Sequence, residues 1–139
     1  MPLIEPLIEV VSVAFVRDGA VLTVRKRGTS RFMLVGGKPE PGESAEEAAR
    51  REVLEEVGLQ VGELTGVGEY VGAAANEPGH QIRSTTFLAD VPAGHEPEAR
   101  AEIEELRWHP LSAPATDDLA PVLTEFVLPL LRERLALGG

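Results

Sequence analysis

The sequence predicts an α/β sandwich, in which strands are mixed with two substantial helices. Val-rich segments bounded by turn residues predict the strands, and two longer stretches have helical composition or spacing. The chain has 139 residues, of which 43% are hydrophobic and 26% charged, and this is enough apolar material for one packed core. We therefore expect a single domain over residues 1–139.

A β-hairpin is expected to open the chain. Ile8–Val16 has the composition of a strand, Asp18 and Gly19 give a turn signal, and Ala20–Arg25 is the returning strand. A short apolar run predicts a third strand at Phe32–Val35. Three later strands are expected at Glu69–Ala75, Arg83–Ala89 and Glu104–Trp108.

The first helix is predicted over Ala45–Val57, which contains neither Gly nor Pro. Ser44 is a good N-cap, and Glu47 three residues later completes a capping box. Gly58 suits the left-handed position that ends a helix. The tail from residue 116 has apolar residues at helical spacing, and two prolines should restrict or kink that second helix: Pro121 and Pro129.

The charge and the composition exclude several classes of protein. There are 13 Lys and Arg residues against 23 Asp and Glu residues, so the net charge is 13 − 23 = −10. This balance argues against binding a nucleic-acid polymer or an anionic membrane surface. The absence of Cys excludes disulfides, thiolate zinc sites and a Cys nucleophile. The start of the chain shows no targeting segment, and we expect a cytoplasmic location.

Three glutamates of the first helix form a candidate metal site. Glu52, Glu55 and Glu56 stand at i, i+3 and i+4, where like charges repel one another and a hard divalent cation such as Mg²⁺ would offset the cost. Glu52 and Glu56 project to the side of the helix that carries its alanines. The alternative is a solvated charged face, which two i,i+4 pairs elsewhere on the helix support: Glu46–Arg50 and Glu47–Arg51.

A glycine-rich loop precedes this helix. Gly36, Gly37 and Gly42 leave backbone groups open to a ligand, and the N-terminus of the following helix favours anions. The loop and the acidic helix together therefore suit a substrate in which a metal ion accompanies phosphate groups.

These residues resemble the Nudix box. Gly37, Glu43 and the run Arg51–Leu59 fill all nine specified positions of that 23-residue motif, and a chance match is on the order of one in a billion per start position. The Val-rich hairpin before it and the strand ending in Arg107 and Trp108 are also similar to the family. One departure is Val35, where many members carry Pro.

The resemblance implies an α/β/α sandwich with a mixed β-sheet. It also implies an enzyme that hydrolyses a nucleoside diphosphate linked to another moiety, with Mg²⁺ or Mn²⁺ as cofactor. Glu52, Glu55 and Glu56 would then be metal ligands, joined by the carbonyl group of Gly36. Arg51 and Glu43 would form a supporting ion pair, and Gly58 would end the helix.

The sequence offers several candidates for the proton acceptor and for the phosphate-binding groups. Glu52 or Glu55 can accept a proton from the attacking water, and so can a glutamate outside the box. We select Glu102, which begins the pattern Glu-apolar-x-x-apolar-x-Trp; the alternative is a surface acid at a strand edge. Candidate phosphate-binding residues, which can equally be solvated surface groups, are Arg25, Arg27, Lys38 and Gly37.

Several aromatic and polar side chains are candidates for contact with a nucleotide base. Trp108 is expected to pack in the core, with base stacking as the alternative. Other side chains that can reach a substrate are Phe32, Asn76, Phe87 and the loop residue His80.

The substrate class follows only by elimination among the family's known classes. Markers downstream of the box that are typical of ADP-ribose, dinucleoside polyphosphate and NADH members are absent. A MutT-like activity on a nucleoside triphosphate, including an oxidised one, remains. The alternatives are ADP-ribose or nucleotide-sugar pyrophosphatase activity and a non-catalytic module that senses a nucleotide; prenyl diphosphate isomerase activity is disfavoured by the missing Cys. The resemblance also makes a homodimer plausible.

Overall fold

The structure, a computed structural model, describes residues 7–75 and 78–138, with side chains described as far as residue 134. The elements within these ranges are β1 (Leu7–Arg17), β2 (Ala20–Lys26), β3 (Val35–Gly37), α1 (Ala45–Val57), β4 (Thr65–Ala73), β5 (Gln81–Ala89), β6 (Ile103–Pro110), the π-helix η1 (Leu123–Val127) and α2 (Leu128–Gly138). No helix in the described part is long and apolar enough to cross a membrane.

The strands form a mixed sheet in the order β4-β5-β1-β2-β6, with β3 paired to β1 beside this path. β1 runs parallel to β5 over residues 7–15, while the other pairings are antiparallel. The parallel pair makes β1 the central strand, because it also contacts β2 through its last residues and β3 through Val11–Val13.

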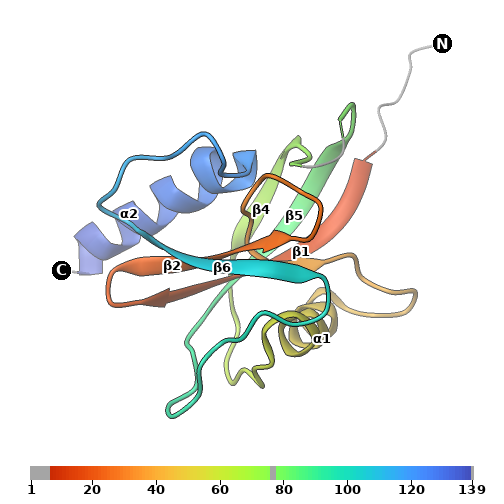
Figure 1. Cartoon of the computed structure of the whole chain (residues 1–139), viewed down its shortest axis with the longest axis horizontal. Helices are drawn as coiled ribbons and strands as arrows, with labels where there is room; N and C mark the ends of the chain where they lie inside the picture. Colours follow the sequence, from red (N-terminus) through yellow and green to blue (C-terminus); the bar gives the residue numbers. More distant parts are fainter. Residues whose placement is uncertain (1–6, 76–77, 139) are drawn as a thin grey trace.

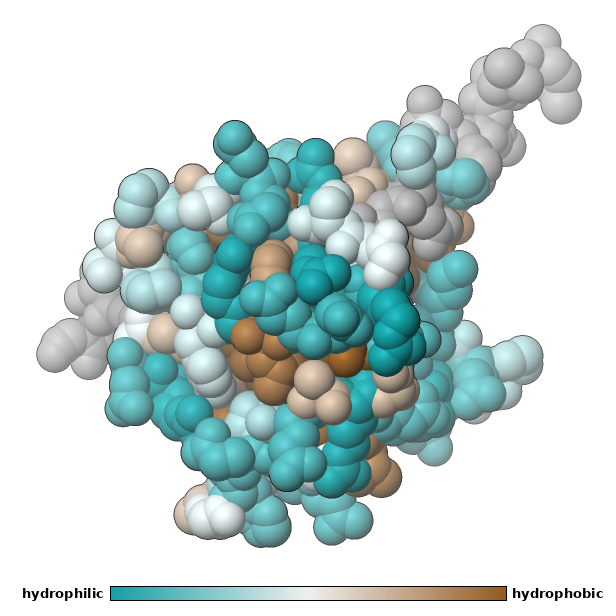
Figure 2. Space-filling model, in the orientation of Figure 1, coloured by the Kyte–Doolittle hydropathy of each residue, from teal (hydrophilic) through white to brown (hydrophobic). Residues whose placement is uncertain are grey.

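Helices cover both faces of the sheet, as Figure 1 shows for α1 and α2. The alternation of β1 explains why: Val11, Val13 and Phe15 face the cluster that contains α1, whereas Ala14 faces the cluster that contains η1 and α2. The α/β/α sandwich with a mixed sheet is therefore confirmed. The face seen in Figure 2 is mostly hydrophilic, and its exposed apolar surface gathers near the centre.

Helix α1 has the ends that the sequence predicts. The Ser44 side chain accepts from the Glu47 amide at 3.1 Å, and the Glu47 carboxylate accepts from the Ser44 amide at 2.9 Å. Gly58 is left-handed, with φ 72°, and its amide donates to Leu54. Both ends of the helix that carries the acidic residues are thus held by local bonds.

The expected third strand lies later in the chain than predicted. At Phe32 and Met33 there are only isolated bridges, to Leu119 and Val24, and the paired strand begins at Val35. Phe32 and Leu34 are buried in the cluster on the α2 face, so this segment crosses between layers before it pairs with β1. Apolar composition alone does not distinguish a crossing segment from a strand.

The C-terminal helix is irregular where the prolines predict it. A π-helical turn, η1, ends directly before α2, and the amide of Leu128 donates to the carbonyl of Leu123. The next residue is Pro129, whose ring is incompatible with a regular preceding α-turn. The wider turn accommodates the ring and keeps Leu123 and Val127 buried.

The capping box makes a stability prediction. Ser44→Ala removes the acceptor for an amide at the start of α1 and should lower the free energy of unfolding by about 1 kcal/mol. Ser44→Asp keeps an acceptor and should stay within a few tenths of a kcal/mol of the wild-type protein. Urea unfolding followed by circular dichroism measures both; equal loss in the two variants would contradict the capping role.

Candidate active site

The carboxylate of Glu56 is buried where α1 meets the sheet. Its side chain is 2% exposed, and Oε1 accepts a hydrogen bond from the amide of Gly36 in β3 at 3.1 Å. Oε2 has no hydrogen-bond partner, and Lys26 Nζ lies 3.9 Å away. Burial raises the pKa of Glu56 to about 8, outweighing the opposite effects of the Gly36 amide and Lys26.

Arg51 ties the loop before α1 to the helix. Its guanidinium donates two bonds to Glu43, at 2.7 and 3.0 Å, and one to the carbonyl of Lys38 at 3.1 Å. On the helix it donates to Glu52 Oε1 at 2.7 Å and lies 3.4 Å from Glu55. The Arg51 bond is the main reason that the pKa of Glu43 falls to about 2. The ion pair implied by the family resemblance is therefore present in the structure.

Two glycines of this loop make close approaches, one to backbone and one to a carboxylate side chain. A Cβ atom at Gly36 would overlap the carbonyl oxygen of Val11 on the paired strand. A Cβ atom at Gly37 would lie 2.6 Å from the carboxylate carbon of Glu52. Position 36 therefore requires glycine for β3 to pair with β1, whereas a side chain at position 37 would displace the Glu52 carboxylate.

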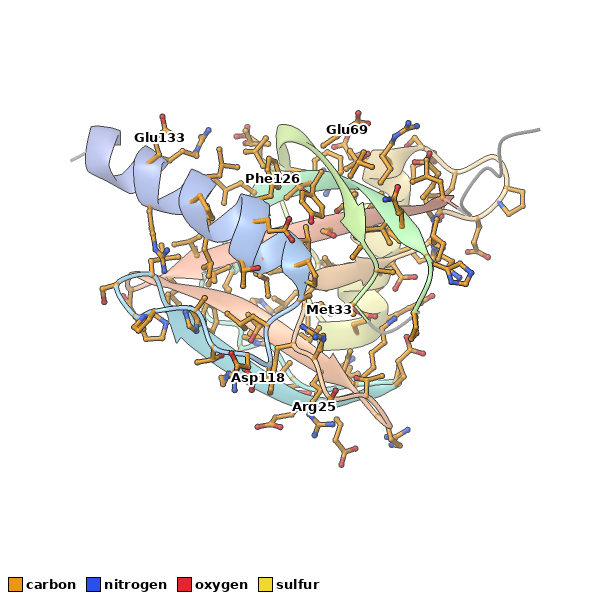
Figure 3. All side chains as sticks on the ribbon, turned by 90° about the horizontal axis from the view of Figure 1, so that it is seen from above. Arg25, Met33, Glu69, Asp118, Phe126 and Glu133 are labelled. Atoms are coloured by element: carbon orange, nitrogen blue, oxygen red, sulfur yellow. The ribbon has the colours of Figure 1, made fainter. Side chains whose placement is uncertain are left out.

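A cavity of about 500 Å³ adjoins this junction. Its polar end contains Glu52, Glu102, Lys26 and Lys38 together with the backbone of the glycine loop. Its apolar side is lined by residues of several elements, among them Ile8, Val10, Met33, Ile82 and Val122. In Figure 3 Met33 lies near the middle of the molecule, while Arg25, near the end of β2, lies toward its lower margin.

The cavity brings together only part of the predicted set. Gly36, Gly37, Lys38, Glu52 and Glu102 all line it. The buried carboxylate of Glu56 lies behind the loop, 3.9 Å from the cavity residue Lys26. Glu55 is 54% exposed on the outer side and pairs with Arg51.

Arg25 and Arg27 do not line the cavity. Arg25 lies 3.3 Å from Glu105 and donates to the carbonyl of Thr29 at 3.0 Å, and Arg27 lies 3.4 Å from Glu104. Period-2 alternation along β2 sends Arg25 away from α1, whereas the next residue, Lys26, points toward it. Arg27 lies in the turn after the strand. Lys26 belongs to no motif, and its only signal in the sequence is the alternation with Leu22 and Val24, which are buried.

The acidic residues suit a hard divalent cation by their chemistry, but the described residues hold no preformed cluster of three ligands. Two cationic side chains lie at these acids instead. Arg51 pairs with Glu52 and Glu55, and Lys26 lies near Glu56. The unpartnered buried oxygen of Glu56 is the observation that fits a cation, because a buried carboxylate oxygen without a partner is costly. A divalent cation at these acids would therefore compete with Arg51 and Lys26.

Most of the candidate base contacts lie away from the cavity. Phe32 is buried under the guanidinium of Arg107 at 3.8 Å, and that guanidinium is paired twice with Asp118 at 2.9 Å. Trp108 packs in the core as expected, with Arg17 over its ring at 4.5 Å, and Phe87 packs against the same cluster. Nδ1 of His80 is hydrogen-bonded to the carbonyl oxygen of Pro78 at 3.2 Å. Asn76 lies outside the described residues.

The family model described as NUDIX domain matches residues 6–128. The chain belongs to the Nudix family. This assignment agrees with the nine filled motif positions and with the helix–loop junction built from them.

Named relatives of this Nudix protein act on nucleotides. It is 33% identical over 88 residues to a Bacillus subtilis (strain 168) protein provisionally named as an 8-oxo-dGTP diphosphatase, covering 63% of this chain and 56% of the relative. It is 33% identical over 114 residues to the oxidized purine nucleoside triphosphate hydrolase of Danio rerio, covering 77% and 72%. It is 36% identical over 80 residues to the CTP pyrophosphohydrolase of Escherichia coli (strain K12), covering 55% and 56%. The matches thus span little more than half the length of two of these relatives.

Solved structures share the fold. A MutT Nudix hydrolase from Burkholderia pseudomallei superposes with a TM-score of 0.73 at 26% identity, covering 91% of this chain and 99% of the other. The MutT protein of Methanosarcina mazei Go1 superposes with a TM-score of 0.79 at 24% identity, covering 96% and 99%. At 24% identity, the similarity to the Methanosarcina mazei Go1 protein shows a shared fold and no more.

The buried carboxyl group of Glu56 predicts a pH dependence of stability. Its pKa is about 8 in the folded protein and 4.5 as the ordinary value, so between these values the folded state holds a proton that the unfolded state has lost. The stabilisation from this group is complete below about pH 4.5 and is lost as the pH rises through about 8. Glu56→Gln stays neutral, so with a chelator its stability relative to the wild-type protein should increase over this window.

Thermal unfolding of both proteins between about pH 5 and 8.5, with chelator present, measures this difference. Other groups titrate alike in the two proteins and cancel in the comparison. Parallel curves for the two proteins would show that Glu56 ionises normally.

Proposed function

We propose that this Nudix protein is a metal-dependent pyrophosphohydrolase that acts on a nucleoside triphosphate. The reaction splits the bond between the α- and β-phosphates with water and releases a nucleoside monophosphate and pyrophosphate. The observation that carries the proposal is the cavity of about 500 Å³, in which Glu52 and Glu102 lie beside Lys26 and Lys38. Carboxylates that suit a cation and ammonium groups that suit phosphates thus line the same cavity as a set of apolar side chains.

Oxidised purine triphosphates are the substrates we favour within this class. Two of the similar proteins carry names that refer to oxidised purine nucleotides, and one carries a name that refers to CTP. The apolar side of the cavity suits a flat base, and we assign no base-reading side chain. Comparison of the triphosphates as substrates would identify the preferred base.

Mg²⁺ or Mn²⁺ is the cofactor we propose, held by Glu52, Glu55, Glu56 and the carbonyl group of Gly36. When bound, such a cation supplies charge neutralisation to the phosphates and lowers the pKa of water. Arg51 positions Glu52 and the loop carbonyl of Lys38, to both of which it donates hydrogen bonds. Glu43 in turn fixes Arg51, and Gly58 ends the helix that holds the glutamates.

Glu102 is our candidate for the proton acceptor. Its side chain is 56% exposed at the cavity and pairs with Lys26 Nζ at 3.2 Å. It follows Ala101, a left-handed non-glycine residue with φ 52°, and its carbonyl accepts from the Arg27 amide at 2.7 Å. A carboxylate on a fixed backbone at the cavity can take a proton from an attacking water. Glu52 is the alternative acceptor inside the box.

The proposal is tested with a panel of substrates. It contains the four common triphosphates, 8-oxo-dGTP, ADP-ribose, a nucleotide sugar and a dinucleoside polyphosphate, each with Mg²⁺, with Mn²⁺ and with chelator. Metal-dependent release of monophosphate and pyrophosphate from a triphosphate, identified by mass, is the expected result. Turnover of ADP-ribose or the nucleotide sugar alone would overturn the substrate class. Tight binding without turnover under either metal would favour the sensing module.

Substitutions on α1 separate catalysis from folding. Glu56→Gln and Glu52→Gln should each lower kcat by about 10²–10⁴-fold, because each removes a carboxylate from the proposed site. Glu46→Gln is the matched control, since Glu46 pairs with Arg50 on the outer side of the same helix. It should keep the wild-type rate. Circular dichroism verifies the fold of all three variants. Wild-type turnover by a folded Glu56→Gln variant would contradict its role as a metal ligand.

Three further expectations stay predictions for the intact protein. These are the cytoplasmic location, the homodimer and the organisation of residues 1–139 as a single Nudix domain.

A further inference from the structure

Lys26 is the ammonium group that the fold brings to the buried carboxylate of Glu56. Its Nζ atom lies 3.9 Å from Glu56 Oε2 and 3.2 Å from Glu102 Oε1. The Lys26 side chain is 31% exposed and lines the cavity, so it joins the buried acid of α1 to the open acid of the loop before β6. One cation thus serves two carboxylates that come from different elements.

The sheet builds this position locally. Lys26 continues the face of β2 that carries Leu22 and Val24 toward α1. The ladder between β2 and β6 shifts register at this point, from Arg25 opposite Glu105 to Lys26 opposite Ile103. The extra residue therefore lies on β6, and the alternation of β2 continues through Lys26. Thr29 then fixes the Lys26 carbonyl with two bonds, from its hydroxyl at 2.7 Å and its amide at 3.0 Å.

The contact with Glu56 is electrostatic and not a hydrogen bond. The 3.9 Å separation is too long for one, and Glu56 Oε2 has no hydrogen-bond partner. The buried oxygen that has no hydrogen-bond partner is therefore the oxygen that faces the ammonium. A divalent cation bound there would stand close to Lys26, and two like charges in a poorly solvated place repel strongly.

We propose that Lys26 is a positioning residue that makes metal binding depend on the nucleotide. Without nucleotide, its ammonium pairs with Glu102, lies beside the buried oxygen of Glu56 and opposes a divalent cation there. With nucleotide, the phosphates in the cavity accept the ammonium, the repulsion is relieved, and the cation binds between carboxylate and phosphate oxygens. The protein would thus bind metal and nucleotide together with positive coupling. This inference rests on the proposed function, because it assumes that phosphates and a divalent cation share the site.

Metal binding without turnover tests the inference. Free Mn²⁺ is measured by electron paramagnetic resonance during titration of the wild-type protein, Lys26→Met and Arg50→Met, with and without a non-hydrolysable α,β-imido nucleoside triphosphate. Arg50→Met is the control for the loss of one positive charge, since Arg50 pairs with Glu46 and the carbonyl of Val61 outside the cavity.

Lys26→Met should bind Mn²⁺ alone roughly tenfold more tightly than the wild-type protein, because the opposing charge is gone. The nucleotide analogue should tighten Mn²⁺ binding several-fold in the wild-type protein and much less in Lys26→Met. Arg50→Met should resemble the wild-type protein in both titrations, and Lys26→Arg should restore wild-type behaviour. A purely structural role for Lys26 predicts the opposite sign, since disturbing the site would weaken Mn²⁺ binding.

Equal or weaker Mn²⁺ binding by a folded Lys26→Met variant, alongside normal turnover by the wild-type protein, would overturn this inference and leave the proposed function intact. Absence of both Mn²⁺ binding and turnover in the wild-type protein would overturn the proposed function itself. Lys26→Gln, which keeps a donor toward Glu102, replaces Lys26→Met if circular dichroism shows that the latter is unfolded.

Discussion

The burial of the Glu56 carboxylate at the junction of α1, β3 and β2 is the constraint on which the rest of the site depends. A carboxylate with a side-chain exposure of 2% must be hydrogen-bonded, neutralised or bound to a cation. The fold supplies one hydrogen bond from Gly36, a proton through the raised pKa, and an ammonium group at a distance. None of these gives Glu56 Oε2 a hydrogen-bond partner. The junction therefore keeps an affinity for positive charge that a fully satisfied structural acid would not have.

Arg51 organises the exposed half of the same site. One guanidinium contacts the loop acid Glu43, the loop carbonyl of Lys38 and two helix acids, Glu52 and Glu55. Planar bidentate geometry suits this role better than an ammonium group would. Arg51 therefore ties the loop to the helix, and the Glu52 that it holds lines the cavity.

The cavity connects the two layers of the sandwich. Val11 belongs to the cluster under α1, whereas Ala120 and Val122 belong to the cluster under α2, and all three line it. This is possible because β3 pairs with only three residues of β1, so the sheet is open beside that pairing. The acidic chemistry comes from the α1 side and the apolar surface largely from the other, an arrangement that suits a ligand with a charged end and a flat apolar end.

Local patterns in the sequence determined the strands of the hairpin, helix α1 with both caps, the irregular C-terminal helix and the Arg51–Glu43 pair, because each rests on residues within one element or one motif. The positions of β3 and Lys26, and the removal of Arg25, Arg27 and Phe32 from the cavity, were decided only by the tertiary structure. Glu105, Glu104 and Arg107 hold these three residues, and they lie more than 70 positions away along the chain. The face that Lys26 takes follows the alternation from Leu22 and Val24, but only the tertiary structure brings Glu56 and Glu102 to its ammonium group.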